Sequence, residues 1–227
     1  MAEAKNRETA GTHDCVHCGE STEGGHFCSK CKRIQPVAPG SDYFAFFGLP
    51  RKLQIDEHRL EASFYALSRQ FHPDYFMNAT EQERQASIER SSMLNDAYRV
   101  LRNPVSRVTY LLTLEGYKEA EKKAPPDILE EVFELNMQIE ELKAAKKMGD
   151  DDEVTQARQA LQDALADLRN KLAEIDQRLV SSFERWDAAL DRQASTAETR
   201  PLLDQMSELL SHRSYIRHLV GNIEEEL

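Results

Sequence analysis

The chain has 227 residues, of which 40% are hydrophobic, and its formal net charge is −11. This length allows one ordinary domain or two small ones, and the composition excludes a disordered, collagen-like or membrane-embedded protein. The longest apolar runs fall far short of the roughly 20 residues that cross a bilayer, so we expect a soluble protein without membrane contact.

The N-terminal segment, MAEAKNRETAGTHD, has none of the features of a targeting sequence. It lacks the apolar centre of a signal peptide, and Glu3 and Glu8 are unlike the acid-poor composition of an organelle transit sequence. We therefore expect the chain to stay where it is made. The expected compartment is a bacterial cytoplasm. A processed organellar form would have a similar sequence and would lie in the mitochondrial matrix.

All four cysteines lie in residues 1–40, before a linker that contains Pro36, Pro39 and Gly40. They form the pattern C-x2-C-x9-C-x2-C: Cys15, Cys18, Cys28 and Cys31. Two C-x2-C pairs converge readily as four thiolate ligands of one ion, which predicts a metal-binding module. Zn²⁺ in a closed structural site is favoured, and iron fits the same cage. Because so small a module has almost no core, the metal is expected to supply most of its folding free energy.

Two other chemistries stay open for these cysteines, namely two disulfides or a redox-active C-x-x-C pair. The lack of a secretory signal and of a strand–helix–strand context around the motif disfavours both. His13, His17 and His26 lie nearby, but four cysteines complete a tetrahedral shell, so we expect the histidines to be bystanders.

Residues 41–116 have a helical pattern that is interrupted at Pro50, Pro73 and Pro104. Between residues 56 and 71, with Asp56 as the N-cap, apolar side chains recur on one helical face: Leu60, Phe64, Leu67 and Phe71. Between residues 82 and 102 a second stripe follows the same spacing: Leu94, Ala97, Tyr98 and Leu101. We expect the two helices to bury these stripes against each other as an antiparallel hairpin.

The tripeptide His72-Pro73-Asp74, here called the corner, follows the first of these helices directly. Proline moves the preceding residue out of the helical region and lacks a backbone donor, so the helix ends there and the next begins near Thr80. This exposes His72 and Asp74, and a carboxylate on a rigid turn is a natural partner for an arginine of another protein. The alternatives are a plain loop or a catalytic pair. The second is disfavoured because adjacent residues do not easily orient each other.

Residues 127–227 carry the surplus acidity, with 23 acidic and 12 basic side chains, which disfavours nucleic acid as a ligand of this half. Three heptad-like apolar seams run through it, and their first members are Ile128, Leu161 and Leu202. Interruptions are predicted at Gly149, Pro201 and Gly221. The breaks at Gly149 and Pro201 favour a monomeric three-helix bundle over an intermolecular coiled coil.

A second apolar row, here called the outer stripe, lies on the first helix of this bundle. It consists of residues spaced by four: Leu129, Phe133 and Met137. Acidic residues flank it: Glu130, Glu134 and Glu141. One interpretation is an exposed partner site with a charged rim. The other is a core face that is three positions wide per heptad.

Three function classes are compatible with these features. The first is an adaptor without an active site of its own, since no phosphate loop, H-E-x-x-H or G-x-S-x-G motif is found. The second is a zinc-ribbon nucleic-acid-binding protein, which depends on three basic residues only: Lys30, Lys32 and Arg33. The third is a structural coiled-coil adaptor.

The segments DYFAFFGLP, SRQFHPDYF and LNDAYRVLRNPVSRVTYLL together resemble the J-domain of DnaJ-type co-chaperones. More narrowly, DYFAFFGLP, HPD, SRVTYLLTLEGY and the acidic half ending in NIEEEL are similar to the HscB branch, which serves iron–sulfur cluster assembly. A four-cysteine module before DYF is similar to the animal members of that branch. The resemblance covers about residues 13–227. It implies a mainly α protein with a zinc module and linker (1–40), a J-domain hairpin (41–116) and a scaffold-binding three-helix bundle (125–227).

The resemblance also implies a function. The protein would be a co-chaperone, not an enzyme, that stimulates ATP hydrolysis by a DnaK/HscA-type chaperone and delivers an IscU-type scaffold protein for iron–sulfur cluster transfer. Chaperone binding would use the corner and basic residues of the helix before it: His72, Pro73, Asp74, Arg69 and Arg59. Scaffold binding would use the first bundle helix: Leu129, Phe133, Glu134, Met137 and Glu141.

One position departs from the J-domain pattern. Many J-domains have a basic residue directly after the tripeptide, whereas Tyr75 and Phe76 follow it here. The basic surface is therefore expected to be thinner in this chain.

Overall fold

The computed structural model describes residues 13–22, 25–117 and 129–227. Helices dominate these segments, which confirms the mainly α prediction. They fall into two compact units that divide between Arg107 and Val108. Every helix in the described segments is too short or too polar to reach across a lipid bilayer. The finer domain division at residues 40, 116 and 125 stays a prediction. The N-terminal segment before His13 and the seam residue Ile128 lie outside the described residues.

The N-terminal region contains two short antiparallel pairings. Strand β1 (His13–Asp14) pairs with β2 (Ser21–Thr22), and a single bridge joins Phe27 to Ile34. Each pairing closes a turn that carries one C-x2-C motif, so the ends of each cysteine turn are held together. Residues 13–35 are called the metal module below.

The rest of the first unit is built on the predicted antiparallel hairpin. Helix α2 (Glu57–Phe71) packs against α3 (Glu81–Arg102), and the short α1 (Tyr43–Phe46) packs on α3 as well. The buried cluster between them also includes a residue of the metal module: Ile34, Phe46, Phe71, Ala86, Leu94 and Ala97. The metal module and the hairpin therefore share one core.

Capping side chains fix where these helices begin. Asp56 caps α2 as predicted, and its carboxylate accepts a hydrogen bond of 3.1 Å from the amide three residues on. Thr80 and Glu83 form a reciprocal capping box at the start of α3. Asn103 precedes α4 (Pro104–Leu114) and accepts a hydrogen bond of 3.0 Å in the same way.

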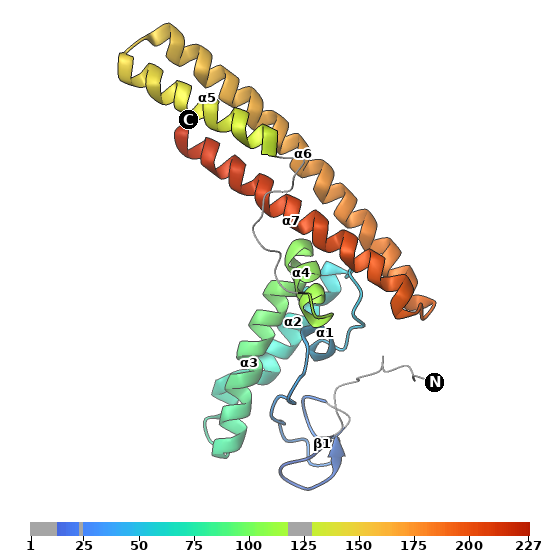
Figure 1. Ribbon diagram of the computed structural model, residues 1–227. Coiled ribbons are helices and arrows are strands. Elements are labelled where there is room, and N and C mark those ends of the chain that lie inside the picture. Colours follow the sequence, from blue (N-terminus) through green and yellow to red (C-terminus); the bar gives the residue numbers. More distant parts are fainter. Residues whose placement is uncertain (1–12, 23–24, 118–128) are drawn as a thin grey trace. The chain divides into compact units, whose positions relative to one another are not determined.

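The second unit contains the predicted three-helix bundle. Helices α5 (Leu129–Met148), α6 (Asp151–Asp191) and α7 (Thr196–Glu226) pack against one another, and α7 runs alongside α6 (Figure 1). Seam residues from all three helices are at most 1% exposed: Leu142, Leu161, Leu179, Met206 and Ile223. Because the seams face one another within one chain, no second chain is needed to bury them.

Two of the three interruptions predicted in this half are wrong. Gly149 does end α5, with a left-handed φ of 75°. Pro201 and Gly221, however, lie inside α7. The capping box of Ser195 and Glu198 starts this helix upstream of the proline, so the proline removes one hydrogen bond near the helix start without breaking it. Gly221 costs about 1 kcal/mol of helix propensity, which the packed bundle tolerates.

Replacing Leu142 by alanine should lower the free energy of unfolding of the bundle by about 2–5 kcal/mol, because a cavity replaces a fully buried side chain. Urea denaturation followed by circular dichroism measures the change. Met148→Ala on the same helix is the control, since this side chain is 78% exposed and its loss should matter by less than about 0.5 kcal/mol. Equal losses of unfolding free energy in the two variants would contradict the place of Leu142 in the buried seam.

Candidate functional site

Two turns of matching geometry present the four cysteines. In the first turn, the Cys15 amide donates to the Glu20 carbonyl (2.7 Å) and the Gly19 amide donates to the Cys15 carbonyl (2.9 Å). In the second turn, the Cys28 and Lys32 amides donate to the corresponding carbonyls at 2.9 and 3.0 Å. Gly19 and Lys32 have positive φ angles of 69° and 62°, which reverses the chain after each cysteine pair.

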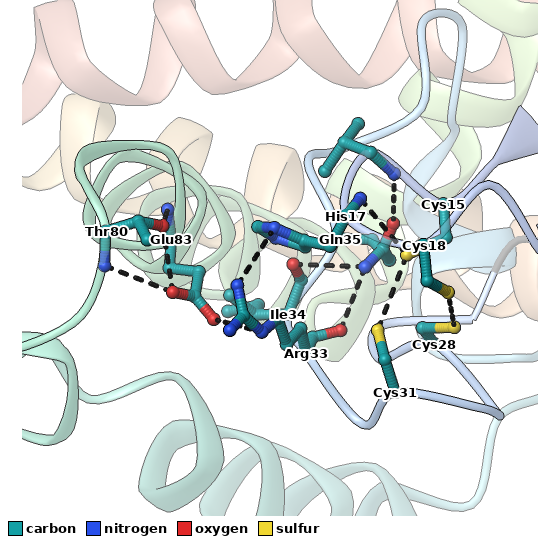
Figure 2. A network of polar contacts seen from close by, with 11 residues as sticks. Cys15, His17, Cys18, Cys28, Cys31, Arg33, Ile34, Gln35, Thr80 and Glu83 are labelled. Carbon is teal, nitrogen blue, oxygen red and sulfur yellow. Dashed lines mark hydrogen bonds and ion pairs between the residues drawn. The ribbon is translucent and has the colours of Figure 1, made fainter.

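The four sulfur atoms converge, as the sequence predicts. All four Sγ atoms lie within 4.8 Å of one another. The closest approaches are 3.6 Å between Cys15 and Cys31 and 3.7 Å between Cys18 and Cys28 (Figure 2). All four thiols are free, and these separations far exceed a disulfide bond of about 2.05 Å, so the disulfide alternative is wrong. The cluster is able to hold a metal ion.

Neighbouring amides tune the protonation of these thiols. Burial raises the pKa of Cys15, but the amides of His17 and Cys18 and the nearby thiols outweigh it and lower the pKa to about 6. The Glu20 amide lowers the pKa of Cys18, whereas burial and the other three thiols raise it to about 11. The cluster therefore contains both thiolates and protonated thiols, and a bound cation would displace the remaining protons.

The residue that precedes the corner is fixed by burial and hydrogen bonds. Phe71, the last residue of α2, is completely buried. Its carbonyl lies at the helix end, where intrahelical partners run out, and it accepts hydrogen bonds from the hydroxyls of Ser87 and Ser91 at 2.6 and 3.1 Å. Both serines belong to α3, so the second helix of the hairpin closes the end of the first.

Directly after Phe71 the chain turns outward. His72 has an extended backbone (φ −57°, ψ 126°), as expected for a residue that precedes proline. The 3₁₀ turn η1 (Pro73–Phe76) follows. The side chains of His72 and Asp74 are 54% and 76% exposed, which agrees with the expectation that the corner faces solvent.

The side chains of His72 and Asp74 contact each other, contrary to the expectation that such close neighbours do not orient each other. The turn at Pro73 brings Nδ1 of His72 to 3.5 Å from the Asp74 carboxylate. Nδ1 also accepts a hydrogen bond of 3.3 Å from the Asp74 amide. Because this amide occupies the nitrogen lone pair, the imidazole caps the turn and is not set up as a general base.

The two arginines of α2 that are expected to take part in chaperone binding lie at opposite ends of the helix. Arg69 is exposed in the last turn of the helix, next to the corner. Arg59 lies in the first turn, about 20 Å away along the helix axis, and its guanidinium is 3.3 Å from Asp56. The structure therefore brings Arg69, but not Arg59, close to the corner.

A buried arginine that the sequence analysis does not single out joins α3 to the metal module. Arg90 is 3% exposed and donates to the carbonyls of Gln35 (2.5 Å) and Pro36 (2.9 Å) and to Nδ1 of His26 (2.5 Å). Burial lowers the pKa of Arg90 to about 10, and burial together with the Arg90 charge lowers the pKa of His26 to about 4. At neutral pH a charged arginine thus donates to a neutral ring. The one sequence signal is its position on the apolar face of α3, four residues before Leu94.

The outer stripe is exposed, so the interpretation as a wide core face is wrong. Leu129, Phe133 and Met137 are 55%, 66% and 49% exposed. Glu134 and Glu141 beside them are also exposed, whereas the Glu130 side chain lies outside the described part of the structure. The opposite face of α5 supplies the buried seam: Leu135, Ile139 and Leu142.

Charged contacts join α5 to both neighbouring helices. Lys171 of α6 pairs with Glu131 of α5. Near the other end, Lys143 of α5 lies 3.2 Å from the Glu226 carboxylate, and Lys146 donates to the Glu226 carbonyl at 2.8 Å. These pairs are partly exposed and add little stability, so the buried seam is what keeps the outer stripe on the surface.

Comparisons with known proteins support one family. No protein-family model matches the chain. The mouse iron-sulfur cluster co-chaperone protein HscB is 29% identical over 220 residues, which cover 94% of this chain and 80% of the mouse protein. The co-chaperone protein HscB homolog of Vibrio vulnificus is 34% identical over 186 residues, which cover 81% of this chain and 95% of that protein.

Among solved structures, the crystal structure of human HscB superposes with a TM-score of 0.67 at 23% identity, over 94% of this chain and 98% of the human one. This agreement shows a shared fold. Because the bacterial relative is more than 30% identical across most of both chains, this chain belongs to the HscB co-chaperone family.

Proposed function

We propose that this protein is a co-chaperone of iron–sulfur cluster assembly, which stimulates ATP hydrolysis by a DnaK/HscA-type chaperone and delivers an IscU-type scaffold protein to it. The observation that carries the proposal is the corner, where a carboxylate that is 76% exposed follows a completely buried phenylalanine. The names of the mouse and Vibrio relatives support it. The protein would act as a monomer without an active site of its own, in a bacterial cytoplasm or a mitochondrial matrix.

The corner has the chemistry to bind an arginine of the chaperone. The Asp74 carboxylate offers two oxygens to a guanidinium, which is the geometry of a strong bidentate pair. Because Phe71 and Pro73 fix the turn beforehand, binding costs little conformational entropy. The positive charge of Arg69 beside the corner, with a more distant contribution from Arg59, would attract an acidic surface and raise the association rate.

The outer stripe is the proposed scaffold site. Three apolar side chains in a row, each about half exposed or more, offer a surface whose burial favours binding. Carboxylates beside the row, at Glu134 and Glu141, form a polar rim that selects the partner by charge. The corner and the outer stripe belong to different compact units, so one chain would hold both partners.

The proposed metal is Zn²⁺, bound by Cys15, Cys18, Cys28 and Cys31. Four sulfurs at about 2.3 Å from a tetrahedral zinc ion stand about 3.8 Å apart, and the closest sulfur pairs here are separated by 3.6 and 3.7 Å. Four thiolates leave no open position for water, so the ion would act in folding and not in catalysis. Iron is the alternative for the same cage.

Asp74→Asn should reduce the stimulation of a DnaK/HscA-type ATPase at least about tenfold, because the arginine of the partner loses its charged acceptor. Steady-state ATP hydrolysis with and without the co-chaperone measures this, and circular dichroism should show unchanged helicity. Asp163→Asn, the same chemical change at an exposed position of α6, should keep full stimulation. Full stimulation by Asp74→Asn would remove the corner from the mechanism.

The double variant Leu129→Ala/Phe133→Ala should bind an IscU-type scaffold about 10- to 100-fold more weakly, because two exposed apolar contacts are lost. Isothermal titration calorimetry measures the affinity. Stability and ATPase stimulation in the absence of scaffold should stay unchanged. As a matched control, Met148→Ala/Val180→Ala removes two apolar side chains of the same unit that are 78% and 50% exposed. If the affinity of Leu129→Ala/Phe133→Ala is unchanged, the scaffold site lies elsewhere.

Elemental analysis of the purified chain should find one metal ion per molecule, with zinc in excess of iron. Cys28→Ser should lose most of this metal, because a hydroxyl replaces a thiolate in the cage. Ser29→Ala, at the exposed neighbouring position, should keep it. A metal content that is independent of Cys28 would contradict the four-thiolate site.

A further inference from the structure

The metal module packs against the residue that precedes the corner. His26 and Phe27 lie between the two cysteine turns, and their ring centroids are 4.9 and 6.0 Å from that of Phe71. The His26 ring also lies 4.8 Å from Phe46 of α1. Ile34, which follows the second cysteine turn, belongs to the same buried cluster. The metal module therefore forms part of the wall that buries the end of α2.

Arg90 makes this packing depend on the fold of the metal module. Its acceptors are His26 and Gln35, from the module, and Pro36, the next residue. The guanidinium carbon lies 5.8 Å from the centre of the Phe71 ring. A buried guanidinium without acceptors is strongly unfavourable. If the module unfolded, Arg90 would have to leave its place beside Phe71 to reach water.

Gln35 connects Arg90 to the cysteine turns. Its side chain is buried and donates through Nε2 to the Arg33 carbonyl at 2.9 Å. Its Oε1 accepts a hydrogen bond of 3.3 Å from the amide of Val16, the residue that follows Cys15 (Figure 2). A continuous set of hydrogen bonds therefore runs from the first cysteine turn through Gln35 to Arg90.

A second contact reaches the chain on the far side of the corner. Arg33, two residues after the last cysteine, lies 3.8 Å from Glu83 (Figure 2). Glu83 accepts hydrogen bonds from the amide and hydroxyl of Thr80 at 3.1 and 2.8 Å and so closes the capping box that starts α3. The metal module thus contacts the chain on both sides of residues 72–79, at Phe71 and at Glu83.

From these contacts we infer that the four-cysteine module, with its metal bound, positions the corner, and that loss of the metal releases it. The module has little core of its own, so its fold depends on the ion, and its fold supplies the surroundings of Phe71 and the acceptors of Arg90. The effect on chaperone stimulation rests on the proposed function. The effect on the order of residues 71–75 does not.

Hydrogen exchange on the unmodified full chain tests the inference directly. Backbone exchange is measured by mass spectrometry for zinc-loaded protein and for protein stripped by a chelator, with the metal content of both determined. Amides in residues 71–75 should exchange at least about tenfold faster after metal removal. The contacts of Arg90 are then already lost, so local opening of this segment costs less free energy. Faster exchange confined to residues 13–35, or spread evenly over α2 and α3, would overturn the inference.

Variants of α3 test whether Arg90 carries the coupling. Arg90→Leu should keep its zinc, yet its corner should exchange as fast as in the stripped native chain. Arg99→Leu on the same helix is the control, since this side chain is 78% exposed and pairs with Asp96 of the same helix at 2.8 Å. It should behave like the native chain. Slow corner exchange in zinc-loaded Arg90→Leu would overturn the role of Arg90.

His26→Ala covers the case in which Arg90→Leu does not fold, because it keeps the arginine and its two carbonyl acceptors. It should speed exchange at residues 71–75 in the zinc-loaded chain, and native exchange rates would count against the inference. Asp74→Asn separates this idea from the proposed function. That variant should keep metal-dependent exchange at the corner even if it no longer stimulates an ATPase.

Discussion

The burial of Phe71 is the constraint on which the first compact unit depends. A helix that ends before a proline has terminal carbonyls without partners and tends to fray. Here the last side chain is completely buried, and two serine hydroxyls of α3 bind the last carbonyl. The following residue is already exposed. An ordered, solvent-facing carboxylate at Asp74 is therefore possible because the residue three positions earlier is held on all sides.

The bundle uses the same physical principle on a different scale. The buried seam of α5 fixes the rotation of this helix, and the rotation in turn exposes the outer stripe. In both units a buried row determines what the surface presents. Buried side chains such as Leu142 and Arg90 would therefore influence the two proposed partner surfaces through position and not through contact.

Local patterns predicted most of the helices, because capping and apolar periodicity act within a few residues, as at Asp56 and Gly149. Contacts between residues far apart in the sequence could not be predicted. The acceptors of Arg90 lie 54 to 64 residues away in the sequence, so no local pattern indicates that the metal module shares a core with the hairpin. The predicted interruption at Pro201 is wrong because a capping box upstream decides where α7 starts. The exposure of the outer stripe could not be predicted either, since it depends on partners of α5 that lie 40 and 80 residues away.

We propose that a DnaK/HscA-type chaperone contacts the corner. The most direct measurement is an NMR titration of the isotopically labelled chain with the ATPase domain of such a chaperone. The largest chemical-shift changes should cluster at residues 69–76, centred on the Asp74 amide, while the signals of α5 stay unchanged. Binding that shifts signals elsewhere and leaves His72 and Asp74 unperturbed would contradict it.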